Sequence, residues 1–337
     1  MRFIVYGAGA IGAVVGARLA QAGCSVVLVA RGSHRERIRA AGLRVESPDG
    51  PSTVDIPVVG HPGEVIPDAD DVVLLTMKSQ DTCAALRDLA AAFPRDVPVC
   101  CLQNGVDNER QALRLFPQVY GVSVACPTAF LEPGVVCAYS APVPGLLDIG
   151  RYPAESSPDP RAETIAAAFR AAGFASEVRP DISRWKHGKL LSNLSNAIEA
   201  VCGPPARHGP IDGLARQEAR DVLAAAGIDY RLEDPASPRL ALIKPRPIGS
   251  VPRPGASTWQ SLTRRTGSVE TAYLNGEIVL LGRLHGVPTP VNELLQLITD
   301  EIARDGLPPG QLTTEEFLAR LPPAATPPVA AAVECCG

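Results

Sequence analysis

The stretch that decides the fold opens the chain: Arg2–Tyr6 reads RFIVY, and Gly7–Gly12 reads GAGAIG. RFIVY is a short apolar run bounded by glycine, which predicts a buried strand. Residues 13–22 then follow a helical pattern that ends at Gly23, and residues 25–30 predict a second strand. The order strand, GxGxxG, helix and strand is typical of a Rossmann-type dinucleotide-binding domain.

Each glycine of this motif has a physical task. Gly7 permits a tight turn, Gly9 lets a pyrophosphate approach the backbone, and Gly12 lets the helix pack closely on the strand. Ala10 and Ile11 complete the first helical turn, whose N–H groups and partial positive charge favour a phosphate. We therefore expect these five residues to bind a dinucleotide cofactor.

The end of the second strand favours one cofactor over another. An NAD enzyme carries Asp or Glu there for the ribose hydroxyls, whereas this chain has Ala30, Arg31, Gly32 and Ser33. Arg31, helped by Ser33 and Arg35, is suited to pair with a 2′-phosphate through charge-assisted hydrogen bonds. We therefore expect NADP(H); the alternative is an ordinary surface arginine in a loop.

The alternation of strands and helices continues through the first half of the chain. Residues 71–77 and 97–102 predict buried strands, with a helix from about 80 to 92 between them. Lys78 and Asn104 follow these strands, at the edge of a parallel sheet where ligands bind. Both are cofactor-site candidates, and Lys78 is also a substrate-site candidate. The alternative is that both are simple turn residues.

The fold class that follows is α/β, with a Rossmann-type domain over residues 1–180. Residues 118–149 predict extended segments around a turn at 132–134, followed by a helix at 162–172 and a short strand at 174–178. After Pro180 the pattern contains helices only, which predicts an all-helical second domain over residues 181–321. Its later helices are expected at 214–226, 257–267, 270–285 and 292–304.

Two segments of the second half do not fit regular helix. Residues 235–254 hold six prolines and predict a loop near the domain cleft or at a partner surface. Residues 322–337 are rich in Ala and Pro, so we expect a disordered tail.

The second domain opens with the helical stretch Arg184–Ala200 (RWKHGKLLSNLSNAIEA). Its leucines recur at helical spacing. Trp185, Lys189, Asn193 and Asn196 fall on one face, which is polar where the neighbouring face is apolar. This face is either an ordinary solvated stripe or part of a site.

Composition excludes several classes of function. The 337 residues carry a net charge of −4, which argues against a nucleic-acid partner, and no apolar run is long enough to cross a membrane. The start shows no signal-peptide pattern, so we expect a cytoplasmic protein. Nine cysteines without a CxxC pair, and histidines scattered singly, predict reduced thiols and no metal site.

Taken together, these motifs resemble the ketopantoate reductase (2-dehydropantoate 2-reductase) family over roughly residues 1–305. The likeness lies in their order and spacing. The segments that match the family are GAGAIG at 7–12, Arg31, TMK at 76–78, QNG at 103–105, KLLSN at 189–193, VETAYLNGEI at 269–278 and HGVPTP at 285–290.

The resemblance implies an NADPH-dependent reductase with its active site in a cleft between a Rossmann domain and a helical domain. It makes Lys189 and Glu270 the catalytic pair and Asn193 a substrate-binding neighbour. It also places Lys78 in the cleft and Asn104 against the nicotinamide and substrate. Further substrate-binding candidates are Asn196, Ser257 and Thr258.

The implied reaction is reduction of a 2-keto acid, foremost 2-dehydropantoate to pantoate in pantothenate biosynthesis. Hydride transfer leaves negative charge on the ketone oxygen, and the Lys189 ammonium is suited to stabilise it and deliver the proton. An ordinary lysine pKa of about 10.4 keeps this acid charged at neutral pH. Glu270 would accept a bond from a substrate hydroxyl and hold the lysine.

Departures from the family pattern leave the substrate open. Ala197 stands where the family has a second amide, Trp259 and Leu262 differ in the substrate wall, and Ala272 replaces a frequent aspartate. The alternatives are reduction of a different 2-keto acid or larger ketone, or a non-catalytic NADP-binding sensor. The resemblance also implies a homodimer as an oligomeric state to test.

Overall fold

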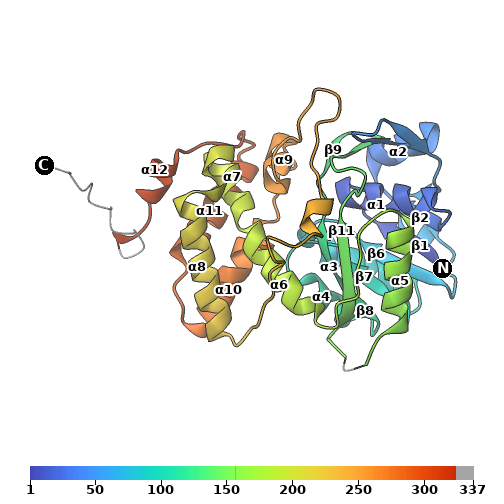
Figure 1. The fold of residues 1–337 in the computed structure, drawn as a ribbon, viewed down its shortest axis with the longest axis horizontal. Coiled ribbons are helices and arrows are strands. Elements are labelled where there is room, and N and C mark those ends of the chain that lie inside the picture. The colour runs from blue at the N-terminus through green and yellow to red at the C-terminus, as the bar shows by residue number, and fades with distance from the viewer. Residues whose placement is uncertain (156, 324–337) are drawn as a thin grey trace, which may run out of the picture. The chain divides into compact units, whose positions relative to one another are not determined.

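The structure, a computed structural model, describes residues 1–155 and 157–323. Two compact units are present (Figure 1). The first contains Met1–Asn193 together with Ile228–Gln260, and the second contains Leu194–Gly227 and the described residues from Ser261 onward. The predicted tail, apart from its first two residues, lies outside the described residues.

A seven-stranded sheet forms the first unit, in the order β11-β8-β7-β6-β1-β2-β5. All neighbouring pairs are parallel except β11 with β8. This is the arrangement of a Rossmann-type sheet, so the α/β prediction is confirmed. The strands are β1 Arg2–Tyr6, β2 Ser25–Val29, β5 Val58–Val59, β6 Asp71–Leu75, β7 Val99–Cys101, β8 Val119–Ala125 and β11 Leu146–Tyr152.

The alternation of side chains along β1 builds one core on each face of this sheet. Phe3 and Val5 pack with α1 (Ala10–Gln21) and α5 (Pro160–Ala171). Ile4 and Tyr6 point to the opposite face, where they belong to the core that includes α3 (Thr82–Ala92) and α4 (Asn108–Leu113). Since both faces are covered, the strands read as continuous apolar runs.

A second, four-stranded sheet packs on α1 and was not predicted. Its order is β4-β3-β10-β9, and its inward residues join the same core as α1. The predicted turn at 132–134 joins β9 to β10, so that part of the prediction is confirmed. Its elements and the adjacent helix are β3 Leu43–Glu46, β4 Ser52–Val54, β9 Thr128–Glu132, β10 Val135–Ala138 and α2 Gly32–Ala41.

The stretch expected as one helix over 184–200 is two helices, α6 (Ile182–Asn193) and α7 (Ser195–Cys202). The helix is interrupted at Leu194, where the chain passes from the first unit to the second. α6 packs on β8 and β11, where glycines leave room for Ile182: a Cβ at Gly150 would lie 2.8 Å from its Cβ. α6 therefore belongs to the Rossmann unit, and the division of the chain differs from the expected boundary at 180.

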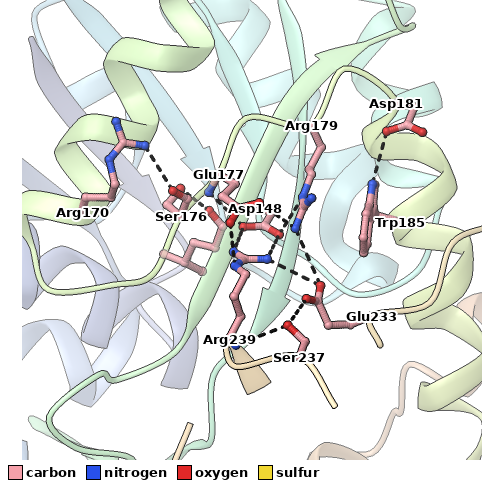
Figure 2. Close-up of polar contacts among 11 residues, drawn as sticks. Asp148, Arg170, Ser176, Glu177, Arg179, Asp181, Trp185, Glu233, Ser237 and Arg239 are labelled. Carbon is pink, nitrogen blue, oxygen red and sulfur yellow. Dashed lines mark hydrogen bonds and ion pairs between the residues drawn. The ribbon is translucent and has the colours of Figure 1, made fainter. Parts of the chain in front are cut away.

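The proline-rich segment is an irregular loop, as predicted, but Ile228–Gln260 belongs to the first unit and not to the helical domain expected over residues 181–321. A cluster of charges ties it there (Figure 2). Asp148 of β11, 5% exposed, accepts two hydrogen bonds from Arg239 at 2.6 and 2.9 Å and one from Arg179 at 3.1 Å. Glu177 and Glu233 complete the cluster.

Backbone contacts follow the same segment along the first unit. Arg231 N donates to Arg184 O in α6 at 2.9 Å, and Arg246 N donates to Tyr139 O at 2.7 Å. We refer to Ile228–Gln260 as the strap.

The second unit is built of helices, in agreement with the prediction of a helical second domain. Its core joins α7, α8 and α11 with Leu262 of α9 and Phe317 of α12. Within the described residues, none of the helices has the length and apolar character to span a membrane. The helices not yet given are α8 Pro210–Ala225, α9 Ser257–Thr263, α10 Asn275–His285, α11 Pro290–Arg304 and α12 Thr314–Leu318, with 3-10 turns η1 Pro62–Glu64, η2 Ser79–Asp81, η3 Pro204–His208, η4 Leu240–Leu242 and η5 Thr271–Tyr273.

Candidate functional site

The three motif glycines differ in the space around them. Gly7 has φ +102°, and a Cβ there would lie 2.6 Å from Met77 N, so only glycine fits this turn. Gly12 lies against the side chain of Thr76, and a Cβ would overlap its hydroxyl. At Gly9, no described atom beyond its chain neighbours lies within 4 Å of a Cβ. Gly7 and Gly12 therefore serve the fold, while Gly9 faces open space.

That open space adjoins the start of α1. Gly9 is the N-cap residue, and within the described residues no side chain caps it by a hydrogen bond. The first turn, with Ala10, Ile11 and Gly12, therefore presents backbone N–H groups and the positive end of the helix dipole. An anion fits there, which agrees with the predicted pyrophosphate site.

Arg31 follows β2 as the N-cap residue of α2 and is exposed, as is Ser33. Its guanidinium lies near the Tyr6 hydroxyl, which donates to Asp88 Oδ2 at 3.2 Å. Burial and the Asp88 charge raise the pKa of Tyr6, and Arg31 opposes this shift. Arg35, the third candidate of this group, packs on the backbone of Gly60. An exposed cation at this strand end is available to an anionic ligand.

Lys78 and Asn104 lie in the loops after β6 and β7, at the carboxyl ends of adjacent parallel strands. Both are half-buried. A buried polar network joins the two loops beneath them. Its bonds run from Gln103 Nε2 to Thr82 Oγ1 (2.6 Å), from Thr82 Oγ1 to Asn108 Oδ1 (2.8 Å), and from Asn108 Nδ2 to Ser79 Oγ (3.1 Å) and Asn104 O (3.0 Å).

Lys189 and Asn193 meet on α6 as their spacing predicts. Lys189 Nζ donates to Asn193 Oδ1 at 2.8 Å. Because lysine only donates, this bond fixes the orientation of the amide. Asn193 is 4% exposed, and its Nδ2 has no hydrogen-bond partner among the described residues. The pair therefore combines an ammonium group with a buried donor that is left over for an acceptor on a ligand.

A second lysine of α6 was missed. Lys186 Nζ forms an ion pair with Glu109 of α4 and donates to Gln103 O at 3.1 Å. The side chains are 5% and 2% exposed, and burial raises the pKa of Glu109 against the effect of the lysine. The sequence signal for this pair is a lysine at a helix position that is otherwise buried. Its partner Glu109 lies 77 residues away in the chain, so spacing could not identify the pair.

Asn196 lies in α7, in the second unit, after the interruption at Leu194. Its Oδ1 accepts from Arg207 at 3.1 Å, and Arg207 also pairs with buried Glu199. Ala197 beside it is part of the helical core. These contacts serve the packing of the second unit.

The remaining candidates lie near the start of short helices. Ser257 and Thr258 begin α9 and belong to the first unit. Glu270, 4% exposed, belongs to the second unit and precedes η5; the helix expected from residue 270 begins only at Asn275. Leu262, expected in a substrate wall, packs in the helical core, while Ala272 is exposed.

Comparison with protein families covers both units. The family model described as "Ketopantoate reductase PanE/ApbA" matches residues 3–153, and its C-terminal counterpart matches residues 181–302. The chain belongs to the ketopantoate reductase family. Members are dinucleotide-binding oxidoreductases, which agrees with the geometry of the glycine loop and α1.

Two curated relatives are both named 2-dehydropantoate 2-reductase. A 2-dehydropantoate 2-reductase of Pyrococcus horikoshii is 34% identical over 203 residues, which are 60% of this chain and 64% of that protein, just under two thirds of its length. One of Halobacterium salinarum is 29% identical over 91% of this chain and the whole of that protein.

Solved structures agree in fold. A PanE/ApbA family ketopantoate reductase from Ralstonia eutropha has 29% identity and a TM-score of 0.76, covering 91% of this chain and 99% of that one. A D-mandelate dehydrogenase with NADH and anilino(oxo)acetate reaches the same TM-score and coverage at 20% identity, a likeness of fold alone.

Proposed function

We propose that this member of the ketopantoate reductase family reduces a 2-keto acid to the 2-hydroxy acid with NADPH, foremost 2-dehydropantoate to pantoate. The observation that carries the proposal is the Lys189–Asn193 pair, in the same unit as an open glycine loop. The names of the curated relatives support the choice of substrate.

The first unit fits a dinucleotide. Gly9 leaves open space for a pyrophosphate, and the N-terminus of α1 supplies N–H donors. Arg31, with Ser33 and Arg35, is proposed to hold a 2′-phosphate, which distinguishes NADPH from NADH. Lys78 and Asn104 are proposed to bind the cofactor at the strand ends. When bound, the nicotinamide supplies the hydride.

The proposed chemistry of the chain's own groups begins at Lys189. Its ammonium stabilises the charge that develops on the ketone oxygen and then transfers a proton to that oxygen. Asn193 holds the ammonium through Oδ1 and offers Nδ2 to a substrate oxygen. Glu270 is proposed to accept a hydrogen bond from a substrate hydroxyl. Ser257, Thr258 and Lys78 are proposed to bind the substrate carboxylate, whereas Asn196, whose amide oxygen accepts from Arg207, is given no substrate contact.

The deciding experiment measures NADPH oxidation with 2-dehydropantoate beside a panel of 2-keto acids and larger ketones. The proposal expects turnover of 2-dehydropantoate with the highest kcat/KM of the panel. A higher value for another ketone would move the assignment to a family member with a different substrate, as the changes at Trp259 and Ala272 would permit. Cofactor binding without turnover of any ketone would support the sensor alternative and reject the reductase.

Lys189→Ala tests the proton donor. Turnover should fall by roughly 10²–10⁴-fold with the Kd of NADPH nearly unchanged, because general acid catalysis contributes on that order. Lys244→Ala, at an exposed lysine of the strap, is the matched control and should keep wild-type kinetics. Unchanged turnover in Lys189→Ala would remove this residue from the mechanism.

Arg31→Ala tests the cofactor. It should weaken binding of NADPH far more than binding of NADH, because only NADPH carries the phosphate that the guanidinium pairs with. Equal weakening of both would contradict the phosphate role.

We further propose that the protein acts in the cytoplasm, in pantothenate biosynthesis, as a homodimer. Sedimentation of the purified chain tests the oligomeric state.

A further inference from the structure

The reaction proposed above leaves the buried Lys186–Glu109 pair without a task. Both side chains are at most 5% exposed. Withdrawing two charges from water costs several kcal/mol for each ion, and apolar residues of similar volume would fill the same space without this cost. Stability alone therefore does not explain a charged pair at this place.

The contacts of Lys186 suggest a different role. On one side the residue belongs to α6, three residues before Lys189. On the other side its ammonium binds Gln103 O, the carbonyl next to Asn104, and the carboxylate of Glu109 in the first turn of α4, which follows that loop. One group thus joins the helix of the proposed acid to the loop of the proposed nicotinamide contact.

The surroundings of the pair leave little freedom. Gly121 of β8 lies beneath it, and a Cβ there would lie 3.3 Å from Lys186 Cδ and 3.4 Å from Glu109 Oε1. The loop is also tied to the segment after β6, since Asn108 Nδ2 donates to Ser79 Oγ at 3.1 Å and Gln103 Nε2 donates to Thr82 Oγ1 at 2.6 Å. A shift of α6 against the loop would break the ion pair and leave a buried charge without its partner.

We propose that Lys186 and Glu109 are positioning residues, which fix the register of α6 against the 103–109 loop and so hold Lys189 and Asn104 in reactive geometry. The proposal rests on the proposed function. Precise placement has a large effect on rate, because a displacement of about 1 Å can lower turnover about 100-fold.

The test uses Lys186→Met, Glu109→Gln and the double variant in the full-length protein. In each single variant kcat should fall about 10- to 100-fold while the Kd of NADPH changes far less than kcat, since the glycine loop is untouched and only the contact of Asn104 with the cofactor is displaced. The double variant should fall no further than the worse single, because the two residues act as one pair. Unchanged kcat per folded molecule in both single variants would overturn the proposal.

Asp71→Asn is the matched control for a purely structural effect. Asp71 is 1% exposed and pairs with Arg2 at 2.6 Å at the amino end of β6, away from the strand ends that carry Lys78 and Asn104. This variant should lower the melting temperature with kcat per folded molecule kept. An equal loss of kcat in Asp71→Asn would overturn the positioning role, because any loss of stability would then have the same effect.

A readout without substrate separates this proposal from the proposed function. If the wild type reduces no ketone, the proposed function fails, and hydrogen exchange then decides on the pair. Glu109→Gln should raise exchange in residues 103–109 and 186–193 together, whereas Asp71→Asn should not. Unchanged exchange in both segments would overturn the proposal whatever the reaction is.

Discussion

Gly188, the residue before Lys189 in α6, lies directly against the backbone carbonyl of Arg231 in the strap. A Cβ at Gly188 would overlap that oxygen and the carbonyl carbon behind it. Both groups are backbone, so no side chain can turn away to make room. The absence of a side chain at Gly188 is therefore what lets the strap pass over α6 beside the proposed acid.

Gly188→Ala should lower stability by about 1–3 kcal/mol, because the strap or α6 must shift to admit the methyl group. Gly213→Ala is the matched control within α8, where no described atom lies close to a Cβ. It should stabilise by about 0.5–1 kcal/mol, as alanine does in a helix interior. Urea unfolding of both variants checks the pair, and equal stability changes would contradict the close approach.

Asp148→Asn should loosen the strap. The change removes the charge that Arg179 and Arg239 share (Figure 2) and costs about 1–3 kcal/mol, less than a fully buried pair because water reaches both guanidinium groups. Limited trypsin digestion should cut the strap sooner than in the wild type. Glu163→Gln, which removes an exposed partner of Arg170, is the control and should cost less than about 1 kcal/mol. Equal digestion rates would contradict a role of Asp148 in holding the strap.

Gly9→Ala and Gly12→Ala should separate cofactor binding from folding. Gly9→Ala adds a methyl group to open space, so the melting temperature should stay near the wild-type value while NADPH binding weakens. Gly12→Ala forces the methyl group into Thr76, so stability should fall as well, by about 1–3 kcal/mol. Thermal melts with and without NADPH check both variants. Undiminished NADPH binding in Gly9→Ala would show that the phosphate lies elsewhere.

The sequence was most informative where partners are close along the chain. The glycine motif occupies six consecutive residues, so the sequence predicted the turn between β1 and α1. Lys189 and Asn193 are one helical turn apart, so their spacing predicted that they share a helix face. Asp148 and Arg239 are 91 residues apart, as Lys186 and Glu109 are 77 apart. Periodicity carries no information on such pairs, and for this reason the strap and the buried ion pair were found only in the structure.

His34 provides the last prediction, through its dependence on pH. The ring is 8% exposed, accepts a hydrogen bond from Gly134 N through Nδ1 at 2.9 Å, and packs on Phe130. Burial lowers its pKa below the ordinary value, despite the opposing effect of the Ala8 backbone nearby. The folded chain therefore takes up this proton less readily than the unfolded chain.

The sign of the effect follows from this difference. The stability that neutral His34 contributes is fully present above its ordinary pKa of about 6.5, and it is lost as pH falls toward the lowered value. His34→Asn keeps an acceptor for Gly134 and cannot ionise, so its free energy of unfolding should fall less steeply in this range, by up to about 1.4 kcal/mol per pH unit.

His285→Asn, at an exposed histidine, is the control and should leave the slope of the wild type unchanged. His187 is half-buried, and desolvation lowers its pKa as well; it remains in both variants, so only the difference between the curves reports on His34. Parallel curves for the wild type and His34→Asn would show that folding does not lower the pKa of His34.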